Sequence, residues 1–328
     1  MADLSTRYLG LELPNPLIVG SCTHTISPAR VEALAEQGAG AVVLKSIFEE
    51  QIVAEVESMV EALEQDAQGE AYEYLRADLP MQLGPQAYLD KIREIKSRVD
   101  IPVIASINCV SPRRWVDFGK KVEAAGADAI ELNIYDIPDD AETAGSDVEQ
   151  RHVATAAALK QAVAIPIAVK IGPFYSSILN FARRIAESGV DGIVLFNRFF
   201  QPDINTETLR LESRVNFSRP EDILLPLRWT AILRGQVSCD LSLTTGVHNA
   251  DGVIKALLAG ADTVQVCSAL YQKNDNLLRE MLEGIAEWMA DKEYGTISDF
   301  RGLLREEDPG ARRGFCRVQY VRTLVGLE

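Results

Sequence analysis

The chain of 328 residues carries a net charge of −15, with 47% hydrophobic and 25% charged residues. This composition provides a sizeable core and excludes a disordered chain, and the negative charge argues against a general binder of nucleic acid or anionic membranes. The five cysteines are odd in number and scattered without metal-ligand spacing, which indicates reduced thiols and no bound metal. The N-terminus does not resemble a secretory signal, and no run approaches the about 20 apolar residues of a membrane helix. We therefore expect a cytoplasmic protein.

The first half of the chain alternates short apolar runs, typical of buried strands, with stretches of helical periodicity. The predicted strands cover 17–21, 41–44, 101–108 and 129–133. The predicted helices cover 27–37, 86–98 and 113–125. About forty acidic, less patterned residues separate the second strand from the next helix.

The second half repeats this alternation. Its predicted strands cover 165–170, 192–196, 241–246 and 263–266. Its predicted helices cover 148–163, 177–188, 224–234, 250–259 and 275–290, and a C-terminal extension with a basic segment follows. We interpret that segment as a helix packed on the barrel, with docking of a partner or an anionic ligand as the alternative; its arginines are Arg312, Arg313, Arg317 and Arg322.

Two kinds of strand entry alternate along the chain. Four strands follow a glycine that ends the preceding helix, where the left-handed conformation costs glycine little; these are Gly38, Gly126, Gly189 and Gly260. Three of the other four strands are entered through Pro16, Pro102 and Pro166. Eight strand–helix units with continuously apolar strands predict a single α/β domain over 1–328, a (β/α)8 TIM barrel with insertions after strands 2, 4 and 6 and a C-terminal helical extension. A doubly wound sheet is the alternative.

Polar residues stand at the C-terminal ends of these strands, where such barrels place their active sites. They are Ser21, Lys45, Asn108, Asn133, Lys170, Asn197, Thr244–Gly246 and Cys267–Ser268. Two lysines and three asparagines on one rim suit a flat, hydrogen-bonding, partly anionic ligand. The last two groups follow strands seven and eight, where many barrels bind phosphate through backbone N–H groups.

These strand ends are embedded in motifs that resemble the dihydroorotate dehydrogenase family, including the matching domain of dihydropyrimidine dehydrogenase. The motifs are NPLIVGS, VVLKS, PVIASINC, GADAIELN, PIAVKI, TTGV and QVCSAL. The resemblance extends from Asn15 to about Ala290. It implies an FMN-dependent oxidoreductase that acts on a CH–CH bond, with pyrimidine metabolism as its setting.

The resemblance also implies roles for individual residues. Lys170 would place its charge near the flavin N1–O2 edge, and Lys45 would hydrogen-bond the ring; an ion-paired or snorkelling lysine is the alternative at both positions. The full set implied to bind the cofactor is Gly20, Ser21, Lys45, Ser46, Asn108, Asn133, Lys170, Thr245, Gly246, Cys267 and Ser268.

The chain departs from the family where substrate chemistry occurs. The catalytic Cys or Ser of the family is replaced by Asp136, which is a candidate base, with a solvated loop aspartate as the alternative. The loop that binds the pyrimidine through two asparagines reads 75–81 here, lacks both and contains Arg76. Arg198 follows Asn197 and adds a charge on the substrate side. We therefore expect a small-molecule substrate other than dihydroorotate.

Two other functions remain open from the sequence. One is a non-redox barrel enzyme that binds a phosphorylated substrate and uses Lys170 as a Schiff-base lysine. The other is a flavin-binding protein without catalysis. The family resemblance further implies a homodimer and an electron-transfer partner subunit.

Overall fold

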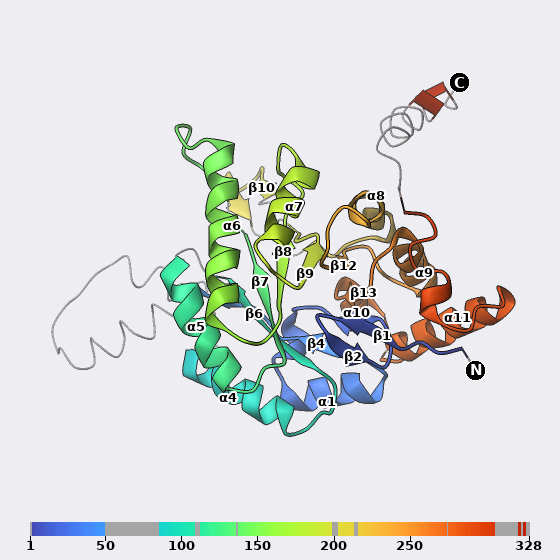
Figure 1. The fold of residues 1–328 in the computed structure, drawn as a ribbon. Coiled ribbons are helices and arrows are strands. Elements are labelled where there is room, and N and C mark those ends of the chain that lie inside the picture. The colour runs from blue at the N-terminus through green and yellow to red at the C-terminus, as the bar shows by residue number, and fades with distance from the viewer. Residues whose placement is uncertain are drawn as a thin grey trace.

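The computed structural model describes residues 2–49, 85–108, 112–135, 137–198, 203–212, 216–273, 275–305, 321–322 and 324–325. Within them, eight parallel strands form a closed ring surrounded by helices (Figure 1). The ring consists of β3 (Leu17–Val19), β4 (Ala41–Val43), β6 (Val103–Asn108), β7 (Ala129–Asn133), β8 (Ile167–Ile171), β9 (Gly192–Leu195), β12 (Asp240–Thr244) and β13 (Thr263–Val266). The pairings of β4 with β6 and of β13 with β3 complete the ring, which confirms the predicted (β/α)8 barrel.

Helices cover the outside of the barrel (Figure 1). They are α1 (Pro28–Glu36), α4 (Pro85–Lys96), α5 (Pro112–Ala124), α6 (Gly145–Ala162), α7 (Ile178–Glu187), α8 (Leu224–Leu233), α9 (Ala250–Ala259), α10 (Ser268–Gln272) and α11 (Leu277–Asp291), with short 3₁₀ helices η1 (Thr23–Thr25), η2 (Pro220–Ile223) and η3 (Ile297–Asp299). The main apolar core lies between these helices and the outward side chains of the strands.

Local signals explain the helix ends. The side chain of Asn249 caps α9 by accepting a hydrogen bond of 3.0 Å from the Gly252 N–H. Gly260 ends the same helix with a φ of 109°, and the other three predicted stop glycines also have positive φ. The alternation of glycine stops and strands read from the sequence is therefore present in the structure.

An N-terminal hairpin closes the bottom of the barrel. Strands β1 (Thr6–Tyr8) and β2 (Leu11–Leu13) pair antiparallel, and Tyr8 and Leu9 pack in one cluster with the inward side chains of the lower barrel, such as Ile104. The backbone N–H of Leu9 donates to the Asp240 carboxylate at 2.7 Å. Because the lower end is filled in this way, any large cavity has to lie at the opposite end.

Five features differ from the sequence prediction. The strand expected over 241–246 ends at Thr244, because Thr245 and Gly246 have φ values of 81° and 78°, which no strand accepts. The helix expected over 275–290 is preceded by the separate helix α10. The hairpin β1–β2 and a second one, β10 (Asp203–Asn205) with β11 (Arg210–Glu212), were not predicted, because three-residue strands carry almost no periodic signal. The two-residue strand β5 (Ile47–Phe48) was not predicted for the same reason.

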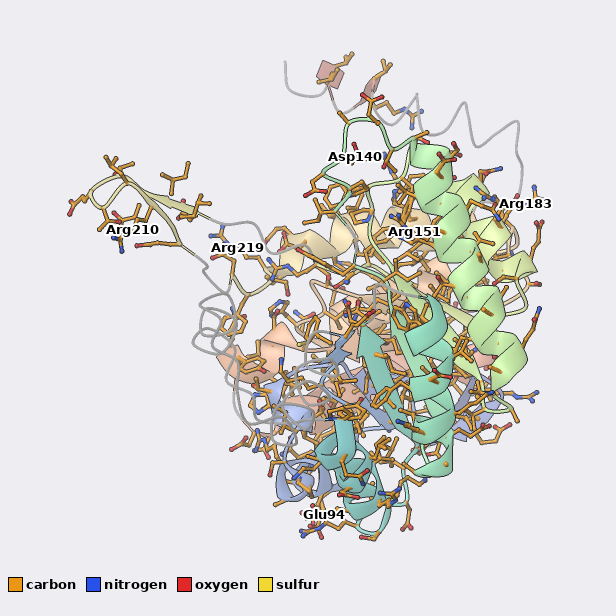
Figure 2. The ribbon with its side chains drawn as sticks, turned by 90° about the vertical axis from the view of Figure 1, so that its left-hand side faces the viewer. Glu94, Asp140, Arg151, Arg183, Arg210 and Arg219 are labelled. Carbon is orange, nitrogen blue, oxygen red and sulfur yellow. The ribbon has the colours of Figure 1, made fainter. Side chains whose placement is uncertain are left out.

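The second hairpin belongs to the segment between β9 and α8. Figure 2 shows it projecting from the body of the molecule, with Arg210 on it and Arg219 near its base. Its apolar side chains Ile204, Leu209 and Leu211 are exposed. The segment therefore extends outward from the end of the barrel at which the strand β9 ends.

Candidate active site at the C-terminal end of the barrel

A cavity of about 500 Å³ opens at the C-terminal ends of the strands. This volume lies in the range of small-molecule and cofactor sites. Its wall combines residues that follow β3, β4, β7, β8, β9, β12 and β13 with the loop before η2. Nearly every strand of the ring therefore contributes to one site.

A buried polar triad forms the floor of the cavity. The Lys170 ammonium lies 3.4 Å from Glu131 Oε1 and donates to Gln265 Oε1 at 3.1 Å, while Gln265 Nε2 donates to Glu131 Oε2. Glu131 is only 1% exposed, so its charge requires these partners. Strands β7 and β13 face each other across the ring, and the Glu131–Gln265 contact therefore crosses the barrel interior.

A chain of hydrogen bonds orders one side of the rim. Ser21 Oγ accepts from the Ser46 backbone N–H at 2.9 Å, Asn133 Nδ2 donates to Ser46 Oγ at 3.3 Å, and Asn197 Nδ2 donates to Asn133 Oδ1 at 2.6 Å. Ser46 also bonds Ser106 at 2.7 Å beneath the rim. These contacts hold the polar ends of β3, β4, β7 and β9 in fixed positions.

The opposite end of the cavity is built on a tight turn. Gly246 follows β12 with φ 78°, and a Cβ at this position would lie 2.2 Å from the Ile223 nitrogen. Its N–H points to Ser218 Oγ at 3.4 Å, and the Ser218 N–H donates to Ser268 Oγ at 3.0 Å. Only glycine allows this close approach of the two loops.

His248 contacts this end of the cavity through Ser218. Its Nε2 lies 3.2 Å from Ser218 Oγ. Burial lowers the pKa of His248, and the nearby Lys273 ammonium lowers it further. The imidazole is therefore favoured in its neutral form and holds the Ser218 hydroxyl without adding charge.

Lys45 is a cation in the wall without a counter-charge among the described residues. Lys45 is half-buried and lines the cavity, and among the described residues it has no hydrogen bond or ion pair. Arg198 also lines the cavity, and its guanidinium donates to the Asn216 carbonyl. In a chain of net charge −15, this local positive charge favours an anionic ligand over a cationic one.

Comparison with known proteins gives the family. The sequence profile described as dihydroorotate dehydrogenase matches residues 3–289. The chain belongs to the dihydroorotate dehydrogenase family.

Individual relatives are distant but cover the chain nearly end to end. The protein named dihydroorotate dehydrogenase B (NAD(+)), catalytic subunit, of Pyrococcus abyssi is 26% identical over 92% of this chain and 98% of its own length. Proteins of the same name from Thermoplasma acidophilum and Methanocaldococcus jannaschii are each 25% identical over 92% of this chain and 99% and 98% of their own lengths. The homology supports an oxidoreductase that is a divergent member of the family.

Most of the residues that the family pattern singles out come together in the cavity wall. They are Gly20, Ser21, Lys45, Ser46, Asn133, Lys170, Asn197, Arg198, Thr245, Gly246, Cys267 and Ser268. Asn108 is buried at the end of β6 and is not among the described lining residues. Asp136 and Arg76 lie outside the described residues, as do Arg312, Arg313 and Arg317.

Several residues of the wall were not predicted from the sequence. Gln265 sits inside an apolar strand, as does its partner Glu131, and both point into the barrel. A polar residue at an inward position of an apolar run is the signal that could have found them. The stacked rings of Phe217 and Tyr271, with centroids 5.0 Å apart, also line the cavity. Their pairing joins segments far apart in the chain and has no local signal.

Among the described residues, no helix combines the length and apolar character that a bilayer crossing requires. These residues also contain no group of three or more His, Cys, Asp or Glu side chains arranged to hold a metal ion.

Proposed function

We propose that the chain is an FMN-dependent oxidoreductase that takes hydride from a CH–CH bond of a small substrate other than dihydroorotate. The observation that carries the cofactor assignment is Lys45, a half-buried ammonium in the cavity without a partner among the described residues. An anionic ligand of cofactor size would satisfy this charge and fill the cavity of about 500 Å³.

The residues present fit the chemistry of a flavin nucleotide. Lys170 would hold a charge at the edge of the ring, and the serines and amides of the rim would hydrogen-bond its polar atoms. The turn at Thr245–Gly246 and the N–H groups at Cys267–Ser268 would face the phosphate. When bound, FMN supplies the two-electron acceptor for the substrate hydride. The Glu131–Gln265 pair would keep Lys170 in one orientation.

The sequence supports the substrate part of the proposal. Asp136 stands where the family has its catalytic Cys or Ser, and we propose it as the base that removes a substrate proton. The loop 75–81 lacks the family's two asparagines, and a site without those amides leaves the polar groups of a pyrimidine ring unpaired. Arg198 and Asn197, on the cavity wall, would contact the substrate.

The proposal includes an assembly. Relatives are named catalytic subunits, and we propose a homodimer that passes electrons to a partner subunit. The Schiff-base alternative is less favoured, because Lys170 is held in an ion pair with Glu131, whereas such a lysine attacks as a neutral amine.

The purified protein's absorption spectrum tests the cofactor assignment. We expect a flavin spectrum, or its appearance after FMN is added, with the bound nucleotide identified by mass spectrometry. Anaerobic addition of a panel of cyclic amides and reduced nicotinamides should then reveal a donor that bleaches the flavin. A colourless protein that does not bind added FMN contradicts the cofactor assignment, and efficient bleaching by dihydroorotate contradicts the substrate part.

A further inference from the structure

Two cysteine side chains share one part of the cavity wall, and neither thiol has a role in the proposed function. Cys22 follows β3 and Cys267 directly follows β13. The two strands are adjacent and parallel, with Val19 opposite Val266. Cys267 Sγ lies 3.8 Å from the carbonyl oxygen of Ser21, the residue bonded to Cys22. The sulfur of Cys267 therefore lies beside the peptide that leads into Cys22.

The two thiols also have different surroundings. The neighbouring Cys267 thiol, the backbone N–H groups of His24 and Thr25 in η1 and the Tyr271 hydroxyl together outweigh burial and lower the pKa of Cys22 to about 7. The neighbouring Cys22, together with burial, raises the pKa of Cys267. Near neutral pH a substantial fraction of Cys22 is therefore thiolate, while Cys267 stays a protonated thiol. This is the arrangement of an attacking and a resolving cysteine.

Ordinary explanations for paired cysteines account less well for this arrangement. A metal centre needs further ligands, and no group of three or more suitable side chains exists among the described residues. A purely structural buried thiol behaves like Cys239, where burial raises the pKa to about 12. Cys22 differs because it lines a cavity that small molecules can enter, although only 7% of its surface is exposed.

We propose that Cys22 and Cys267 form a peroxide-sensitive dithiol that closes into a reversible disulfide at the cavity wall. The Cys22 thiolate attacks one oxygen of hydrogen peroxide; the S–O bond forms, the O–O bond breaks, and hydroxide leaves and is protonated to water. Cys267 sulfur then attacks the sulfur of the sulfenic acid; the S–S bond forms, the S–O bond breaks, and a second water leaves. The two thiols lose two electrons in total, and one peroxide is reduced to two waters.

The disulfide would tie the end of β3 to the end of β13. Ser21 and Ser268, the neighbours of the two cysteines, both line the cavity. Oxidation would therefore act on the wall of the candidate active site, and a thiol reductant would restore it. This inference does not depend on which ligand occupies the cavity.

Thiol mapping of the purified full-length chain tests the proposal. The protein is exposed to a stoichiometric amount of hydrogen peroxide, blocked with iodoacetamide, digested without reductant and examined by mass spectrometry. We expect a Cys22–Cys267 linked peptide, loss of two of the five thiols per chain, and recovery of both after dithiothreitol. Cys239 serves as the internal control and should stay a free thiol.

Two substitutions separate the roles of the pair. In Cys267→Ser, the Cys22 sulfenic acid has no resolving partner and should be trapped by dimedone, whereas in Cys22→Ser the thiol of Cys267 should persist. Circular dichroism of both variants verifies their folding. If a variant does not fold, the thiol mapping of the wild-type protein still tests the proposal. The proposal is overturned if Cys22 and Cys267 are both recovered as free thiols after peroxide, as Cys239 is, or if Cys22 links to a different cysteine or to a second chain.

Discussion

At the scale of single residues, Lys45 is the side chain whose surroundings point most directly to a ligand. Its ammonium is half-buried in the cavity, and the described residues offer it no counter-charge. A hydrogen bond to a charged group contributes about 1.5–3 kcal/mol. Lys45→Ala should therefore weaken FMN binding by about tenfold or more, measured as the Kd from flavin fluorescence.

Two control variants sharpen this prediction. Lys45→Arg keeps the positive charge and should retain most of the affinity. Lys255→Ala removes an exposed lysine that pairs with Asp251 on the surface, and it should leave the Kd unchanged. If the alanine variants at 45 and 255 bind FMN equally well, Lys45 is not part of the cofactor site.

Lys170 and Glu131 form a buried ion pair, and removing either partner would leave the other charge buried without a counter-charge. The side chains are only 12% and 1% exposed. Lys170→Met strands a buried carboxylate and should lower the free energy of unfolding by about 3–5 kcal/mol, whereas the double variant with Glu131→Gln should regain a large part of it. Urea unfolding of the single and double variants measures this coupling. Additive losses would mean that the pair is not coupled.

The low pKa of Cys22 should be visible in the pH dependence of its alkylation rate. The thiolate is the reactive form and appears as the pH rises above the pKa, so the rate of Cys22 alkylation should increase with pH and level off above a midpoint of about 7. The groups that face it are the Cys267 thiol, the Tyr271 hydroxyl and the N–H groups of η1.

Cys239 provides the comparison for this measurement. Burial raises its pKa to about 12, and its peptide should react at least about a hundredfold more slowly at pH 7. The rates are read from the same digests by mass spectrometry. A Cys22 rate that still climbs steeply above pH 9 would contradict the low pKa.

At the scale of elements, the turn between β12 and α9 depends on one glycine. Gly246→Ala adds a Cβ 2.2 Å from the Ile223 nitrogen and requires a positive φ from alanine. We expect a loss of about 1–3 kcal/mol in unfolding free energy and weaker FMN binding, because η2 has to move. Gly145→Ala is the matched control, since a Cβ there meets nothing within 4 Å. Equal stability of the two variants would refute the close approach.

The two hairpins differ in how far they are buried. The hairpin β1–β2 is packed into the bottom of the barrel, where Tyr8 is 1% exposed and Leu9 is 3% exposed. The hairpin β10–β11 projects outward near the open end, with Leu209 84% exposed (Figure 2). One end of the barrel is therefore closed by the chain's own N-terminal segment, and the other is left for a ligand.

At the scale of the whole molecule, the cavity joins residues from nearly all strands, so an occupied cavity should stabilise the entire barrel. A ligand at a hundred times its Kd adds about 2.7 kcal/mol to the unfolding free energy. We expect FMN to raise the Tm in a thermal unfolding assay by several degrees. Riboflavin, which lacks the phosphate, should raise it less at the same concentration. Equal shifts would argue against a phosphate site at Thr245–Gly246.

The sequence by itself determined the barrel and most of its rim. The stop glycines, such as Gly126 and Gly260, and the apolar strands are local features, and a parallel barrel brings the ends of such strands together whatever the details of packing. Lys45, Lys170 and Asn133 could therefore be assigned to one rim from their positions alone. Asp136, on which the substrate chemistry is proposed to depend, lies outside the described residues and remains a prediction.

Tertiary structure decided which side chains meet. Glu131 and Gln265 are 134 residues apart, and their contact across the barrel has no local signature in the sequence. The same holds for the approach of the Cys267 sulfur to the Ser21 carbonyl, which joins residues 246 positions apart. Contacts of this kind depend on the register between strands that are far apart in the sequence, such as β13 and β3. Periodicity reports which face a residue takes, whereas only the closed ring determines what stands opposite it.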